Sequence, residues 1–67
     1  MTPDDAARYR AVAVRARTAA DVLVLSVTPD LARVGDRRGH DLAATAIAAL
    51  HDLRDHAEAR ATWAARR

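Results

Sequence analysis

The sequence contains no cysteine, lysine, asparagine, glutamine or phenylalanine among its 67 residues. Without cysteine it can form neither a disulfide nor a zinc site built on thiolates. Its only glycines, Gly35 and Gly39, flank a charged turn and form no phosphate-binding loop. Its single serine, Ser26, lies within an apolar run rather than beside a candidate base. We therefore expect a protein that is not an enzyme and binds no cofactor.

A membrane segment and a targeting signal are also missing from the sequence. The longest run of large apolar residues, Val22–Leu25, is far shorter than the ~20 residues that cross a bilayer. The segment Met1–Asp5 has none of the basic residues that begin a secretory signal peptide. We expect a soluble protein of the cytoplasm that has no membrane partner.

All eleven cations are arginine, and this bias indicates a GC-rich coding genome, so we expect a bacterial or phage source. The isoelectric point is about 10.4 because arginine stays protonated at ordinary pH. The net charge is nevertheless only +2, since nine acidic residues are interleaved with the arginines. Such interleaving is typical of a solvated helical surface.

The size of the chain predicts one domain over residues 1–67 and a need for further stabilisation. Eighteen residues are alanine, and only sixteen side chains are large and apolar. So small a chain buries a small fraction of its surface. With disulfides excluded, self-association is the remaining common source of stability. We expect a homo-oligomer, either a dimer or a tetramer.

The tripeptide Thr-Pro-Asp occurs at residues 2–4 and again at residues 28–30. Each copy predicts a helix start: the threonine can cap an orphan amide, proline is tolerated at the first helical position, and aspartate complements the helix dipole. Asp5 is placed for a reciprocal capping contact with the first threonine. Proline at position 29 also disfavours helical geometry at the residue before it.

These signals predict a first helix from Pro3 to about Val27 and a short helix from Pro29 to about Val34, ended by Gly35. A polar turn at 36–39 would lead to a last helix beginning near His40 or Asp41. The two long helices would be about equal in length, which favours antiparallel packing. The predicted fold is all-α: an antiparallel helical hairpin with a short helix in the connector, two copies of which would form a four-helix bundle.

Helical periodicity predicts which residues pack. The first helix has one apolar stripe of Tyr9, Val12, Ala16, Ala19, Ala20, Leu23 and Val27. A second, roughly opposite stripe contains Ala11, Val14, Thr18, Val22 and Leu25. The stripe of the last helix contains Leu42, Ala46, Ala49, Leu50, Leu53, Ala57, Ala61 and Ala64, with Ile47 at its edge. Because the first helix has two apolar faces, we expect it to form the subunit interface through Tyr9, Val12, Val14, Val22, Leu23 and Leu25.

The end of the last helix is the predicted partner-binding edge. Except for the additional Arg66, its residues follow one another at intervals of three or four positions, so they share one edge of the helix. Tryptophan and arginine are also enriched at binding hot spots. The edge contains His56, Arg60, Trp63, Arg66 and Arg67. Two alternatives remain open for Trp63: it packs over Tyr9 at the end of the hairpin, or it stacks on bases of a nucleic acid.

A cluster of histidines and aspartates lies in the last helix. His51 with Asp55, and Asp52 with His56, are pairs four residues apart. One helix supplies too few ligands for a metal, so a site would need two subunits. The alternative is an exposed face with local ion pairs.

Residues Val22–Val27 are rich in β-branched side chains and are compatible with a strand, although the helical flanks favour a helix. As a strand followed by Thr28-Pro29-Asp30-Leu31 and a long helix, this region resembles a ribbon-helix-helix repressor or antitoxin. That resemblance implies a strand with polar side chains in the DNA major groove. Here the alternating residues are almost all apolar, so they cannot read base edges by hydrogen bonds.

The sequence predicts a small non-enzymatic helical module that self-associates and binds an unidentified protein partner, as an adaptor, an inhibitor or a small accessory subunit. The alternative is a small arginine-rich regulator that binds nucleic acid, of the transcriptional repressor or antitoxin type.

Overall fold

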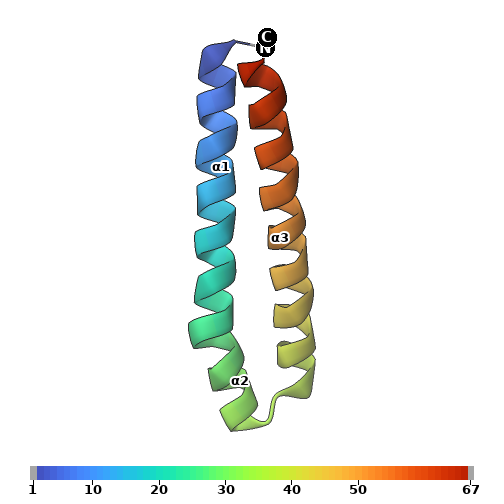
Figure 1. The fold of residues 1–67 in the computed structure, drawn as a ribbon. Coiled ribbons are helices and arrows are strands. Elements are labelled where there is room, and N and C mark those ends of the chain that lie inside the picture. The colour runs from blue at the N-terminus through green and yellow to red at the C-terminus, as the bar shows by residue number, and fades with distance from the viewer. Residues whose placement is uncertain (1, 67) are drawn as a thin grey trace.

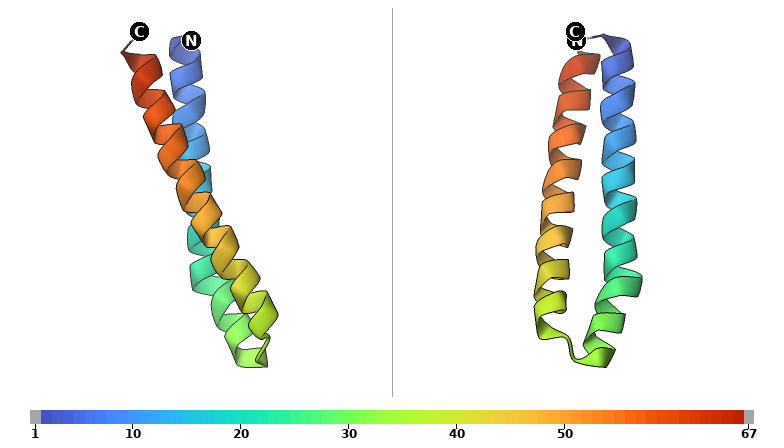
Figure 2. Two further views of the ribbon diagram at one scale, coloured as in Figure 1. Left: turned by 90° about the vertical axis from the view of Figure 1, so that its right-hand side faces the viewer. Right: turned by 180° about the vertical axis from the view of Figure 1, so that it is seen from behind.

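The computed structural model describes residues 2–66 as two antiparallel arms (Figure 1). The first arm comprises α1 (Pro3–Val22), the π-helical segment η1 (Leu23–Val27) and α2 (Thr28–Val34), which follow one another without a break. The second arm is α3 (Arg37–Ala65). The arms lie side by side and cross at a shallow angle (Figure 2). The all-α hairpin is confirmed, and residues 2–66 contain no strand.

The start of α1 forms as predicted. Thr2 is extended, with φ −104° and ψ 167°, and its Oγ1 accepts a hydrogen bond from the backbone N–H of Asp5 at 3.3 Å. The backbone N–H of Thr2 donates in return to Asp5 Oδ2 at 3.0 Å. This reciprocal capping satisfies two amides that the helix itself leaves without partners. The bond from the Thr2 backbone N–H is also the main reason why the pKa of Asp5 lies below its ordinary value of 3.8.

The predicted helix break at Thr28 is wrong. Thr28 is helical, with φ −58° and ψ −46°, and its N–H donates to the carbonyl of Leu23, five residues back. In an α-helix the ring of Pro29 would clash with the carbonyl four residues before it. The wider π-helical turn of Leu23–Val27 accommodates the ring, so the helix continues into α2. The segment is helical, as its flanks predicted, and the strand that a ribbon-helix-helix protein requires is absent from it.

The turn between the arms ends α2 where expected and starts α3 earlier than expected. Gly35 ends α2 in the left-handed conformation, with φ 73°. Asp36 then caps α3: its Oδ1 accepts from the N–H of Gly39 at 2.8 Å, so the helix begins at Arg37 rather than near His40 or Asp41. A Cβ on Gly39 would lie 2.5 Å from Asp36 Oδ2, so glycine is what allows this cap.

The contact between the arms, which we call the alanine seam, is made of small side chains. Its buried residues are Ala6, Ala13, Ala16 and Ala20 of α1 and Ala43, Ala57, Ala61 and Ala64 of α3. Ala20 is 0% exposed and Ala57 is 1% exposed. Among residues 2–66 no larger side chain is fully buried. The hairpin therefore has a narrow line of close contact rather than a bulky core.

The predicted stripes are displaced from this seam. On α1 the predicted Val12 and Ala19 are exposed, and Ala13 is buried instead. On α3 the predicted Leu42 and Leu53 are 52% and 44% exposed, and the predicted Ala49 is exposed as well. Ala43, which is not in the predicted stripe, is buried. The reason is steric, because only small residues fit between closely packed arms. The bulky residues lie beside the seam.

Candidate functional site

An arginine joins the two arms at the end of the hairpin away from the turn. The Arg60 guanidinium carbon lies 5.9 Å from the centre of the Tyr9 ring on α1 and 5.2 Å from the centre of the Trp63 ring on α3. Cation–π contacts of this kind are worth ~0.5–1 kcal/mol at exposed sites. Trp63 thus lies at the Tyr9 end of the hairpin, as one of the predicted alternatives requires, but it remains 40% exposed.

The Arg60–Tyr9 contact shows which stripes of the two arms lie on the same side of the seam. Side chains three and four residues apart share one side of a helix. The side marked by Arg60 and Tyr9 therefore includes a stripe from each arm, and we call it the apolar face. Its apolar members are Tyr9, Val12, Ala16, Ala19 and Leu23 on the first arm and Leu42, Ala46, Ala49, Leu53 and Trp63 on the second.

The charged side chains Asp5, Arg8 and Arg60 lie at the end of the apolar face away from the turn. Asp5 and Arg8 line a shallow hollow of about 350 Å³ there, together with Tyr9 and Val12. From Val12 to the turn on the first arm, and from Leu53 to the turn on the second, alanine and larger aliphatic residues predominate in the stripes, and the polar residues at the same spacing are Arg15, Ser26 and Thr45. This face is therefore suited to contact with another apolar surface.

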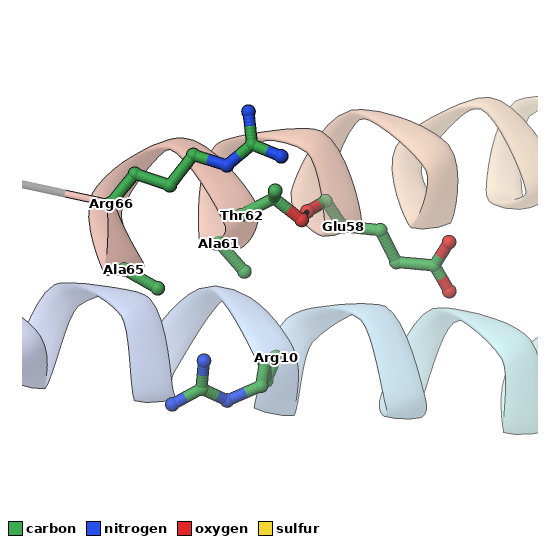
Figure 3. Close-up of a pocket in the computed structure, with 6 residues that line it drawn as sticks. All are labelled: Arg10, Glu58, Ala61, Thr62, Ala65 and Arg66. Atoms are coloured by element: carbon green, nitrogen blue, oxygen red, sulfur yellow. Dashed lines mark hydrogen bonds between the residues drawn. The ribbon is translucent and has the colours of Figure 1, made fainter.

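The other side of the seam is polar and hollowed, and we call it the charged groove. It comprises two neighbouring hollows of about 570 Å³ and about 320 Å³, and Arg10 and Glu58 line both. Figure 3 shows Ala61 and Ala65 pointing from α3 toward α1 in the larger hollow, with Arg10 below them on α1. The remaining lining residues are Thr62, Arg66, Ala13, Val14 and Arg17.

The residues predicted for self-association are divided between these surfaces. Tyr9, Val12 and Leu23 belong to the apolar face. Val14, two residues from Val12, lines the charged groove instead and is 65% exposed. Val22 and Leu25 are 53% and 76% exposed, respectively. Exposure shows that these side chains are accessible, but the structure does not bring all six together.

The predicted partner-binding edge is divided as well. Arg60 and Trp63 lie together with the apolar face, and His56 precedes them by one turn on the same stripe. Arg66 lines the charged groove on the other side. Arg67 lies outside the described residues. The grouping of Arg66 with Arg10 across the seam was missed by the sequence argument, because spacing along one helix carries no information about the facing helix.

Within the described part of one chain, the histidine and aspartate cluster does not bring together enough ligands for a metal ion. Within residues 2–66 no group of three or more histidine, aspartate or glutamate side chains could hold a metal ion. Asp55 accepts hydrogen bonds from Arg54 at 3.0 Å and 2.9 Å. Among the described residues neither of the predicted pairs, His51 with Asp55 and Asp52 with His56, forms an ion pair.

Comparisons with known protein families, with curated proteins and with solved structures find no match for this chain. No helix within residues 2–66 is long and apolar enough to span a bilayer. The apolar face and the charged groove are therefore the features from which a function can be inferred.

Proposed function

We propose that the protein is a cytoplasmic, non-enzymatic interaction module that self-associates through its apolar face. A second copy packs the same face against it, and the two hairpins form a four-helix bundle. The observation that supports this proposal best is the position of the bulky apolar residues. Val12 on the first arm and Leu42, Leu53 and Trp63 on the second lie beside the alanine seam and on the same side of it, whereas Val14 lines the charged groove.

That displacement is what a four-helix bundle requires. In an isolated hairpin each helix has one neighbour, so its apolar stripe should be centred on that neighbour. In a bundle each helix has two neighbours, and its stripe is centred on the bundle axis between them. Val12 on one arm and Leu53 on the other are both turned toward such an axis, with 37% and 44% of their surfaces exposed.

The dimensions of a single hairpin support the same proposal. Its radius of gyration is 15.0 Å, whereas a compact domain of this length has one of about 11 Å. Its accessible surface is 4957 Å², whereas a compact protein of this mass exposes about 4,100 Å². A second copy on the apolar face would remove part of that excess and would shield Leu42, Leu53 and Trp63 from water.

Two valines two residues apart provide a matched test. Val12 lies on the apolar face and Val14 in the charged groove. Light scattering on a gel-filtration peak should give the wild type at least twice the chain mass of 7.2 kDa. We expect Val12→Glu to reduce this to the mass of one chain, because it places a charge in the apolar contact. Val14→Glu should leave the mass unchanged. A monomeric wild type, or dissociation caused by Val14→Glu alone, would refute the proposal.

A nucleic-acid-binding regulator is the second candidate, because Arg10, Arg17 and Arg66 gather on one side of the hairpin. Glu58 lies between them and opposes a phosphate backbone, so this candidate ranks below the first. Binding of this kind should weaken steeply with added salt. A gel-shift titration with duplex DNA at low salt tests it, and an unshifted duplex would remove it.

A further inference from the structure

On the side of the hairpin that self-association leaves open, we propose that the charged groove binds an acidic amphipathic helix of a second protein. Carboxylates of that helix pair with the arginines along the groove, while its small apolar side chains contact the alanines between them. This proposal concerns a different surface from the apolar face, so it stands or falls independently of the dimer.

The shape of the groove suits a helix. It follows the line between two antiparallel arms, and its two hollows are neighbours that share Arg10 and Glu58 as lining residues. Between the charged residues the groove is lined by Ala13 of α1 and by Ala61 and Ala65 of α3. Such small residues leave room for the side chains of a third helix to pack into the space between the first two.

The charges of the groove select an acidic partner. Within residues 2–66 the ion pairs are Arg33 with Asp30 and Arg54 with Asp55, so Arg10, Arg17 and Arg66 have no carboxylate partner there. A guanidinium presents a planar set of donors that matches a carboxylate. Three arginines against the single Glu58 leave the groove with an excess of positive charge.

The spacing of the arginines defines the partner further. Arg10 and Arg17 both line the hollow on α1 and lie two helical turns apart, ~10 Å along the axis. Two glutamates seven residues apart on a facing helix have the same separation and would meet both guanidinium groups. Glu58 lines both hollows. A lysine or arginine on the partner helix, between its two glutamates, would pair with Glu58 and complete the match.

Two other occupants fit the groove less well. A phosphate backbone carries negative charge continuously and would be repelled by Glu58. A second copy of the hairpin would bring its own Arg10, Arg17 and Arg66 to the same groove, since a two-fold interface uses the same surface on both subunits. Like charges would then face one another.

The test uses a synthetic helical peptide rich in alanine and leucine, with two glutamates seven residues apart and a lysine between them. A control peptide carries lysines in place of the glutamates and a glutamate in place of the lysine. Fluorescence anisotropy with labelled peptide should show saturable binding of the acidic peptide, at one peptide per chain. Its dissociation constant should rise with salt concentration, because exposed charge pairs are screened. The control peptide should not bind.

Charge-reversal variants assign the binding to the groove. Arg10→Glu combined with Arg17→Glu should weaken binding at least tenfold. Arg15→Glu combined with Arg38→Glu changes the net charge equally but lies outside the groove, and it should change the affinity less than threefold. Glu58→Gln should tighten binding about twofold to threefold. Circular dichroism checks that each variant is folded. If the Arg10→Glu and Arg17→Glu variant does not fold, the Glu58→Gln variant still tests the proposal.

The outcomes that overturn the proposal are distinct from those that refute self-association. Failure of the acidic peptide to bind, equal binding of the lysine peptide, or an equal loss in the Arg15 and Arg38 control would each overturn it. Loss of the dimer in the Arg10 and Arg17 variant would also overturn it, because the groove would then be the self-association surface. A monomeric wild type that binds the acidic peptide would refute the four-helix bundle and support the groove.

Discussion

The tripeptide Thr-Pro-Asp occurs twice in the first arm, and the two copies adopt different structures. At residues 2–4 it begins α1: Thr2 is extended and its hydroxyl accepts the N–H of Asp5. At residues 28–30 it lies inside a continuous helix, and Thr28 is helical. The hydroxyl of Thr28 is buried and has no hydrogen-bond partner among the described residues.

The difference shows that a capping signal depends on its neighbours on both sides. After the first tripeptide Asp5 supplies the carboxylate that completes the reciprocal cap, whereas Leu31 occupies the equivalent place after the second. Before the second tripeptide the chain is already helical, so there are no orphan amides for Thr28 to cap. A helix that can widen to a π-turn at Leu23–Val27 need not end at Pro29.

The largest effect should come from replacing Pro29, with Pro3 as the comparison. Pro29→Ala restores a backbone N–H within a continuous helix and should raise the free energy of unfolding by about 1–3 kcal/mol. Pro3→Ala should change the free energy of unfolding by less than about 0.5 kcal/mol, because a backbone N–H in the first turn has no hydrogen-bond partner within the helix. Urea unfolding at equal chain concentrations measures both. A destabilised Pro29→Ala variant would show that α2 depends on the π-turn for its packing against α3.

An intermediate effect, opposite in sign at the two sites, should follow from replacing each threonine by valine. Thr2→Val removes the cap of α1 and should cost about 1 kcal/mol. Thr28→Val replaces a buried hydroxyl without a partner by a methyl group of similar size and should stabilise by about 1 kcal/mol. Thermal unfolding of the two variants beside the wild type tests the contrast. A loss of stability at both sites would mean that Thr28 also donates a structural hydrogen bond.

The smallest effect should be the pH dependence that Asp5 confers on the first site. Its pKa is lowered in the folded chain, mainly by the hydrogen bond from the Thr2 backbone N–H. The contribution of the charged carboxylate is therefore complete above the ordinary pKa of 3.8 and is lost as pH falls through the lower folded value. Melting temperatures from pH 5 to pH 2 should decline less steeply in Asp5→Asn than in the wild type.

Much of the fold could be predicted from local signals. The all-α hairpin, the cap at Thr2 and the end of α2 at Gly35 depend on residues close in sequence, and all are confirmed. α3 begins earlier than the predicted His40 or Asp41, because Asp36 caps the helix instead of lying within a polar turn. Its capping bond to Gly39 requires a glycine at that position, which the sequence does contain.

The packing could be predicted only in part. Periodicity identifies the apolar sides of the helices, and it predicts Val12 and Leu53 as members of the packing stripes, with Val12 also in the subunit interface. The structure places Ala13, which was not in the predicted stripe, and Ala57, which was, in the contact between the arms, because the distance between two helices is set by what fits between them. The charged groove combines Arg10 with Arg66, residues at opposite ends of the chain, so no local pattern could have predicted it.

The alanine seam reverses the usual relation between side-chain size and mutational sensitivity. In most cores the costly change is a large residue made small, because a cavity remains. At Ala20 and Ala57, which are 0% and 1% exposed, there is almost nothing to remove, and the costly change is any added methylene group. A systematic scan in which residues are replaced by alanine would leave the eight buried positions untouched. The residues that hold this protein together are those that such a scan cannot test.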